Sequence, residues 1–253
     1  MDRRDFLGVA LEGFVVALFA QRVSADELLN RGASATVRSW VAAHDDIARQ
    51  LSAGRITGRA WQEEVERLAS RVNAAELLAQ IDFDRLERTI DLDQPGGSKR
   101  VVKLPHPDDP SRRLRFGTAI FGLRQRYAIT PHAHRNMVSA HMVIRGQLHV
   151  RNFDRVGEER GHIIVEPTVD GVLRPGDLST MSTELNNVHW FTALTPRAFT
   201  LDVVVDGLLP GEERYVIELL DVRNAQKVSN GRRRARIIDW QESLRLYGIE
   251  AEG

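Results

Sequence analysis

The chain has 253 residues, of which 42% are hydrophobic, and its 35 basic and 35 acidic side chains balance to a formal charge of zero. This is enough for one large domain, or for a core domain plus a small one, and the even charge argues against a nucleic-acid or polyanion partner. The sequence contains no cysteine, which excludes disulfides, thiolate metal ligands and a cysteine nucleophile.

Residues 1–25 resemble a bacterial twin-arginine signal peptide. Arg3 and Arg4 are followed closely by Phe-Leu, and an apolar run covers residues 9–20. That run is shorter than the roughly 20 residues of a membrane-spanning helix, and small residues precede Asp26 at the expected cleavage point. We therefore expect a periplasmic or secreted protein with no membrane contact beyond this signal. The alternative is an ordinary amphipathic N-terminal helix.

Residues 26–97 are predicted to form a helical segment. Apolar residues recur there at helical spacing in three runs, and Ala-Gly and Thr-Gly pairs interrupt the first two. We interpret Trp40 and Trp61 as helix-packing residues rather than ligand contacts. Asn73 or Asp84 is expected to mark the start of a later helix. Nothing in this segment indicates chemistry.

Residues 98–222 are predicted to form a β-barrel. A turn-rich stretch, 93–98, separates them from the helical segment, and short β-rich runs follow with Gly and Pro between many of them. Regularly spaced short strands are typical of a sandwich or barrel. The predicted strands are 99–104, 114–123, 127–130, 138–145, 147–153, 162–165, 178–181, 190–194 and 200–205.

Residues 223–253 are predicted to be a C-terminal extension. They contain an Asn-Gly turn, an arginine run at 232–234 and a short amphipathic stretch around Trp240. The arginine run offers a site for a phosphate or an acidic partner. We favour the other interpretation, a solvated turn after Asn-Gly.

Three histidines in the predicted barrel point to metal chemistry. His132 and His134 are two residues apart, so on a β-strand their side chains project from the same face. His189, on a distant predicted strand, would complete three neutral nitrogen ligands for a divalent transition metal with open positions on the far side. The alternative for His132 and His134 is a pair of solvent-facing loop histidines.

The order of these motifs resembles the cupin barrel, a double-sheet jelly roll. Gly146 ends the strand after the first histidine pair, and a Pro-Gly-Asp turn at 175–177 precedes His189. In the common cupin pattern a glutamate follows the first pair, whereas Val138 or Ser139 occupies that place here. The missing carboxylate favours a site of three histidines alone.

A longer series of motifs runs from about residue 115 to 205. Its members are Thr118–Leu123, Ile129–His134, Gly146–Asp154, Asn187–Ala193 and Leu201–Val203. This series resembles the plant cysteine oxidase and 2-aminoethanethiol dioxygenase family of thiol dioxygenases. The resemblance implies Fe(II) held by His132, His134 and His189, with Asp202 as a polar catalytic group beside it. It also implies oxidation of a small thiol or a cysteine-bearing peptide to a sulfinate by O2.

The chemistry of the ligand set is consistent with iron. Three neutral imidazoles leave the full +2 charge on the metal, which a thiolate substrate would offset while O2 takes the open face. Twin-arginine export carries folded proteins, so iron could be loaded away from copper and zinc, which bind more tightly. Two alternatives stay open: another metal-dependent cupin, such as a zinc or manganese isomerase or hydrolase, and a non-enzymatic exported binding module.

The family continues after the Leu-Asp-Val motif with a Gly-Pro-Pro-Tyr loop, which this chain replaces by residues 204–211. The identity of the thiol is therefore left open, as is the oligomeric state. Asp202 lies in an apolar strand, where a carboxylate needs a partner, so it either braces the barrel or faces the substrate.

Four further residues are candidates for the site. We interpret His149 as a core histidine or one that supports a metal ligand, and His141 as facing either the pocket or the solvent. Arg124 and Arg126 could bind a substrate carboxylate, but exposure is the favoured interpretation because arginine is seldom buried unpaired.

Overall fold

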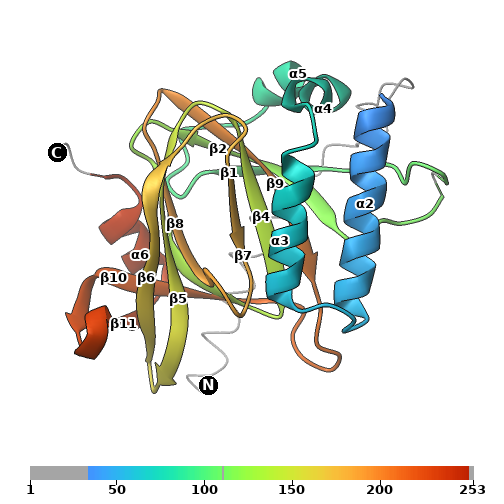
Figure 1. Cartoon of the computed structure of the whole chain (residues 1–253). Coiled ribbons are helices and arrows are strands. Elements are labelled where there is room, and N and C mark those ends of the chain that lie inside the picture. The colour runs from blue at the N-terminus through green and yellow to red at the C-terminus, as the bar shows by residue number, and fades with distance from the viewer. Residues whose placement is uncertain (1–33, 110, 251–253) are drawn as a thin grey trace, which may run out of the picture.

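The computed structural model describes residues 34–109 and 111–250 (Figure 1). The predicted signal peptide, residues 1–25, lies outside the described residues. Within the described ranges, no helix has both the length and the apolar character needed to cross a membrane.

Between residue 34 and the first strand the structure has four helices, in agreement with the helical segment that the periodicity predicted. They are α2 (Ala35–Ser52), α3 (Gly58–Ala69), α4 (Ala74–Gln80) and α5 (Phe83–Glu87). Side chains at Ser34, Thr57 and Asn73 accept hydrogen bonds from backbone N–H groups in the first turns of α2, α3 and α4. Asn73 is thus confirmed as a helix start. Asp84 is not one, because α5 begins at Phe83 after Asp82, whose φ is 48°.

The strands form two sheets that face each other. One has the order β1-β2-β9-β4-β7, and the other, β10-β11-β6-β5-β8-β3, closes on itself because β10 also pairs with β3. The bounds are β1 (Ser98–Val102), β2 (Gly117–Arg124), β3 (Ala128–Arg135), β4 (Met137–Arg145), β5 (Leu148–Glu159), β6 (His162–Leu173), β7 (Leu178–Met181), β8 (Val188–Ala193), β9 (Arg197–Asp206), β10 (Val216–Lys227) and β11 (Arg233–Ile238). This confirms a mainly β fold with a cupin-type jelly-roll barrel behind N-terminal helices.

The helices cover the outer face of the five-stranded sheet, where α2 and α3 stand side by side in Figure 1. Met142 of β4 and Leu201 of β9 belong to the same buried core as Trp40 and Trp61, which confirms the two tryptophans as packing residues. Successive strand residues point to opposite faces. The neighbours of Met142 and Leu201 along β4 and β9 therefore face the barrel interior.

Two predictions about the C-terminal region are wrong: the domain boundary at residue 222 and the extension beyond it. The boundary placed at residue 222 falls inside β10, and β11 pairs with both β10 and β6, so the predicted extension is part of the barrel. Strand β11 was not predicted because the charged Arg234 and Arg236 flank Ala235, the residue that is fully buried, so the sequence shows no apolar run there. The Asn-Gly turn is a short 3₁₀ helix, η2 (Ser229–Gly231), and α6 (Trp240–Tyr247) follows β11.

Two of the three arginines in the run 232–234 are paired with carboxylates. Arg232 lies 3.0 Å from Glu166 of β6, and Arg234 lies 2.6 Å from Glu159 at the end of β5. The run belongs partly to the end of the turn and partly to β11, rather than to a solvated turn alone.

Candidate metal centre

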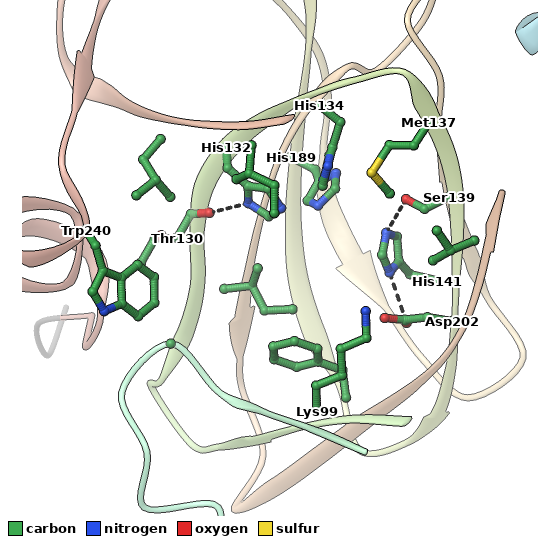
Figure 2. Close-up of a pocket in the computed structure, with 16 residues that line it drawn as sticks. Lys99, Thr130, His132, His134, Met137, Ser139, His141, His189, Asp202 and Trp240 are labelled. Carbon is green, nitrogen blue, oxygen red and sulfur yellow. Dashed lines mark hydrogen bonds and ion pairs between the residues drawn. The ribbon is translucent and has the colours of Figure 1, made fainter. Parts of the chain in front are cut away.

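Strands β3 and β8 bring the three predicted histidines together inside the barrel (Figure 2). In the β3–β8 register His132 lies directly opposite His189, and His134 is two residues further along the same face. The ring of His132 is 4.2 Å from that of His189 and 4.6 Å from that of His134. One nitrogen from each ring lies within 4.8 Å of the others. The prediction that His132 and His134 share one face of a strand is confirmed, and the loop alternative is wrong.

Two of these imidazoles have buried nitrogens without partners. His132 Nδ1 donates a hydrogen bond to the Thr130 carbonyl at 2.7 Å, which leaves Nε2 as the lone-pair nitrogen of the neutral ring. The buried Nδ1 atoms of His134 and His189 have no hydrogen-bond partner among the described residues. An unsatisfied buried polar group costs about 1–3 kcal/mol. Such a cluster fits a metal ion that is shared by the three rings.

All three histidines are held in the protonation state that a metal requires. Burial lowers the pKa of His132 to about 4. Burial, followed by the neighbouring imidazoles, lowers the pKa values of His134 and His189 well below the ordinary range. The rings are therefore neutral at physiological pH, and no proton has to be displaced before a metal binds.

The wall facing the histidines is a polar array on β4 and β9. His141 and Asp202 are partners in the β4–β9 register, and His141 Nδ1 lies 2.9 Å from Asp202 Oδ1. Ser139 Oγ lies 2.8 Å from His141 Nε2, and Thr200 Oγ1 donates to Asp202 Oδ1 at 2.7 Å. The ring of His141 is 5.0 Å from that of His189. The array therefore adjoins the metal centre without joining the three-histidine group.

Asp202 is kept ionised in this buried position. Burial alone raises the pKa of its carboxyl, but His141, Lys99 and the Thr200 hydroxyl together outweigh burial and hold the pKa below its ordinary value. Asp202 lies in the same cavity as the three histidines, and the structure assigns His141 to the pocket rather than to the solvent.

Three other candidates lie away from the cavity. His149 is partly exposed, and its Nε2 lies 2.5 Å from Asp170 of β6, so the interpretation as a core or ligand-supporting histidine is wrong. The exposed Arg124 pairs with Asp93 at 2.6 Å. Arg126 Nε donates to a backbone carbonyl near the C-terminal end at 2.9 Å. The favoured interpretation, exposure, is confirmed for Arg124, whereas Arg126 is only partly exposed. Neither arginine lines the cavity of the three histidines.

The histidines line a cavity of about 100 Å³ between the two sheets. Sequence reasoning missed Lys99 and Trp240 as lining residues, because a lone lysine on a first strand and a tryptophan in an amphipathic helix carry no motif. The lining residues are Gly96, Lys99, Phe121, Ile129, Thr130, His132, His134, Met137, Ser139, His141, His189, Asp202, Val204, Ile217, Leu219 and Trp240.

The fold and this centre together define a cupin-type barrel with a three-histidine site able to hold a metal. No protein-family model and no curated protein matches the chain. Solved structures with similar backbones include KdgF from Halomonas sp., with a TM-score of 0.32 and 19% identity over 46% of this chain and 83% of that one.

Two further solved structures show likeness of the same order. A recombinant oxalate oxidase in complex with glycolate has a TM-score of 0.35 and 19% identity, over 50% of this chain and 57% of that one. A vicilin from Solanum melongena has a TM-score of 0.38 and 14% identity, over 53% of this chain and 34% of that one. At such values the likeness supports no argument about activity. The function must be inferred from the site itself.

Proposed function

We propose that this protein is an Fe(II)-dependent thiol dioxygenase that converts a small thiol or a cysteine-bearing peptide to a sulfinate with O2. The observation that carries the proposal is the convergence of three neutral, buried imidazoles from β3 and β8 on one point of a cavity inside the barrel. The resemblance of the motifs between residues 115 and 205 to the thiol dioxygenases adds to this support.

The donor set fits a metal of this kind. An all-nitrogen set of three imidazoles suits iron, zinc and other first-row metals, and it adds no negative charge that would repel a thiolate. When bound, Fe(II) would supply a positively charged, redox-active centre that favours the thiolate form of the substrate and its oxidation by O2. His132, His134 and His189 would hold it.

The proposed reaction needs no further reductant. A thiol RSH and O2 give RSO2H, so the sulfur loses four electrons, O2 accepts them and both oxygen atoms end on the sulfur. The acidic product then releases its proton. The mainly apolar wall of the cavity would exclude bulk water from this exchange.

Asp202 and His141 provide the polar side of this cavity. Asp202 orients His141 through its contact with Nδ1, and both residues line the cavity opposite the imidazoles. We propose that Asp202 acts on the substrate side of the centre as a catalytic polar group, and that its charge helps to hold the thiol proton and the imidazole of His141 in place.

One observation favours a hydrolase as a second candidate. Ser139, His141 and Asp202 follow the order of a hydroxyl, an imidazole and a carboxylate, with separations of 2.8 Å and 2.9 Å. This is the arrangement by which a serine is activated for acyl transfer. Ser139 is only 1% exposed, however, and the contact would equally serve to fix His141 in one orientation.

Metal analysis followed by oxygen uptake separates these functions. Protein purified without added metal and then loaded with Fe(II) should consume O2 with thiols and yield sulfinates, and Ser139→Ala should keep the bound iron. Activity on esters that needs Ser139, without oxygen uptake, would instead establish the hydrolase. No turnover together with no bound metal would favour a non-enzymatic binding module.

We also propose that the protein is exported to the periplasm or secreted, on the basis of Arg3 and Arg4 ahead of an apolar run. Replacing both arginines by lysine should retain the folded protein inside the cell, since these residues would serve only transport. Equal periplasmic recovery of this variant and the parent would refute the export.

A further inference from the structure

A second and larger cavity adjoins the one that contains the histidines. Its volume is about 340 Å³, against about 100 Å³ for the first. Five residues line both cavities: Lys99, His134, Met137, Val204 and Ile217. A ligand with one end at the imidazoles can therefore extend past these side chains into the second cavity.

The second cavity has a cationic wall. Lys99, Arg115 and Arg214 line it together with one carboxylate, Asp206. Arg214 Nε lies 2.8 Å from Asp206 Oδ1, which balances that pair. The Arg115 side chain instead donates to the backbone carbonyls of residues 206 and 207, at 2.8 Å and 3.3 Å. Among the residues that the structure describes, no carboxylate lies within ion-pair distance of the Arg115 guanidinium.

Lys99 stands where the two cavities meet. It lies on β1 opposite Phe121 of β2, and Figure 2 shows its side chain extending into the first cavity toward Asp202. Burial lowers the pKa of Lys99, while the charges of Asp202 and Asp206 oppose that change. The two cavities together are thus lined by three basic side chains and two carboxylates. The imidazoles are neutral, so they do not alter this count of charges. The lining basic residues are Lys99, Arg115 and Arg214, and the carboxylates are Asp202 and Asp206.

We infer that the second cavity binds the anionic end of the substrate, with Lys99 as the specificity-determining contact, so that the preferred thiol carries a carboxylate. A carboxylate there would meet the excess positive charge and form charge-assisted hydrogen bonds, which are about twice as strong as neutral ones. An ammonium group in the same place would be repelled by Lys99 and Arg115. The inference rests on the proposed function for the thiol end, but the anion site itself does not depend on turnover.

Three thiols with the same two-carbon spacing test the charge preference: 3-mercaptopropionate, 2-mercaptoethanol and cysteamine. With the iron-loaded protein we expect kcat/KM to be at least about tenfold higher for the anion than for the cation. Lys99→Met should bring the ratio of kcat/KM for 3-mercaptopropionate to that for 2-mercaptoethanol close to one, mainly through KM, because the ratio cancels any general effect of the substitution on turnover. Lys103→Met, an exposed lysine just beyond β1, is the matched control and should leave all three unchanged.

A binding measurement keeps this test independent of catalysis. Calorimetric titration with propionate, which has no thiol, should show binding to the parent and to Lys103→Met and at least about tenfold weaker binding to Lys99→Met. Lys99→Gln serves as a second variant if Lys99→Met does not fold.

The outcomes separate the two proposals. Carboxylate binding that depends on Lys99, without oxygen uptake with any thiol, would end the dioxygenase proposal and retain the anion site. A preference for cysteamine, or propionate binding unaffected by loss of Lys99, would overturn the inference even if the protein oxidises thiols. Absence of propionate binding to the parent would overturn it as well.

Discussion

Two groups of buried histidines in this chain differ in what surrounds their nitrogens. His44, in helix α2, is 2% exposed, and its Nδ1 donates to the Trp40 carbonyl at 2.9 Å. Its ring packs 4.0 Å from that of Trp40 and 5.7 Å from that of Phe116. His134 and His189 are also buried, yet the Nδ1 atom of each has no hydrogen-bond partner within residues 34–109 and 111–250, and both rings face a cavity rather than a packed core.

The comparison shows that burial alone does not mark a functional histidine. Burial lowers the pKa of His44 and that of His132 to about 4, so the two are equally neutral at physiological pH. What differs is the remaining hydrogen-bonding capacity. The packed histidine, His44, uses its Nδ1–H in a hydrogen bond to the local backbone. The barrel histidines instead direct nitrogens without protein partners toward one point, where a shared metal ion would satisfy them.

The largest expected effect comes from removing one barrel imidazole. His189→Ala should lower bound metal at least about tenfold, because two neutral imidazoles hold Fe(II) weakly. His149→Ala, on the outside of the barrel, is the matched control and should keep the metal of the parent. The measurement is metal stoichiometry by elemental analysis after gel filtration. An iron content in His189→Ala equal to that of the parent would contradict the assignment of His189 as a metal ligand.

Asp202→Asn probes the wall opposite the metal. The substitution keeps the shape and removes the charge that faces His141, so oxygen uptake with thiols should fall by about 10² while iron content stays the same. Steady-state uptake with metal-replete protein measures this. Unchanged turnover would show that Asp202 only stabilises the barrel. Loss of both iron and activity would show that Asp202 helps to hold the metal ligands in place.

The packed histidine predicts a stability effect with a defined pH range. The pKa of His44 is about 4 in the folded protein, against an ordinary value of 6.5, so protonation favours the unfolded chain. Its contribution is complete above pH 6.5 and is lost as the pH falls toward 4, for a total of about 3 kcal/mol. Denaturant unfolding at pH 7 and about pH 4.5 should show a smaller loss for His44→Gln than for the parent. Equal losses in the two proteins would show that His44 does not carry this dependence.

The smallest effect is expected at the surface. Arg124 is 57% exposed and pairs with Asp93, so Arg124→Ala should change the free energy of unfolding by less than about 1 kcal/mol. Oxygen uptake should match the parent with anionic and neutral thiols alike. A raised KM for the anionic thiol alone would place a substrate contact at Arg124 after all.

Much of this centre could be predicted because it depends on local strand geometry. The i, i+2 spacing of His132 and His134 needs only the alternation of a strand. The pairing of His141 with Asp202 could not be predicted, since it depends on the register between two strands about sixty residues apart in the chain. Strands β10 and β11 were missed because exposed charges interrupt their apolar pattern, and Lys99 because only tertiary packing brings β1 to the cavity.

The most direct test of the central claim is the fate of molecular oxygen at the three histidines. Iron-loaded protein is supplied with a thiol carboxylate under ¹⁸O2, and the product is analysed by mass spectrometry. We predict a sulfinate in which both oxygen atoms carry the label, formed in equal amount to the O2 consumed and absent with His189→Ala. Unlabelled product, or oxygen consumption that yields only disulfide and peroxide, would contradict it.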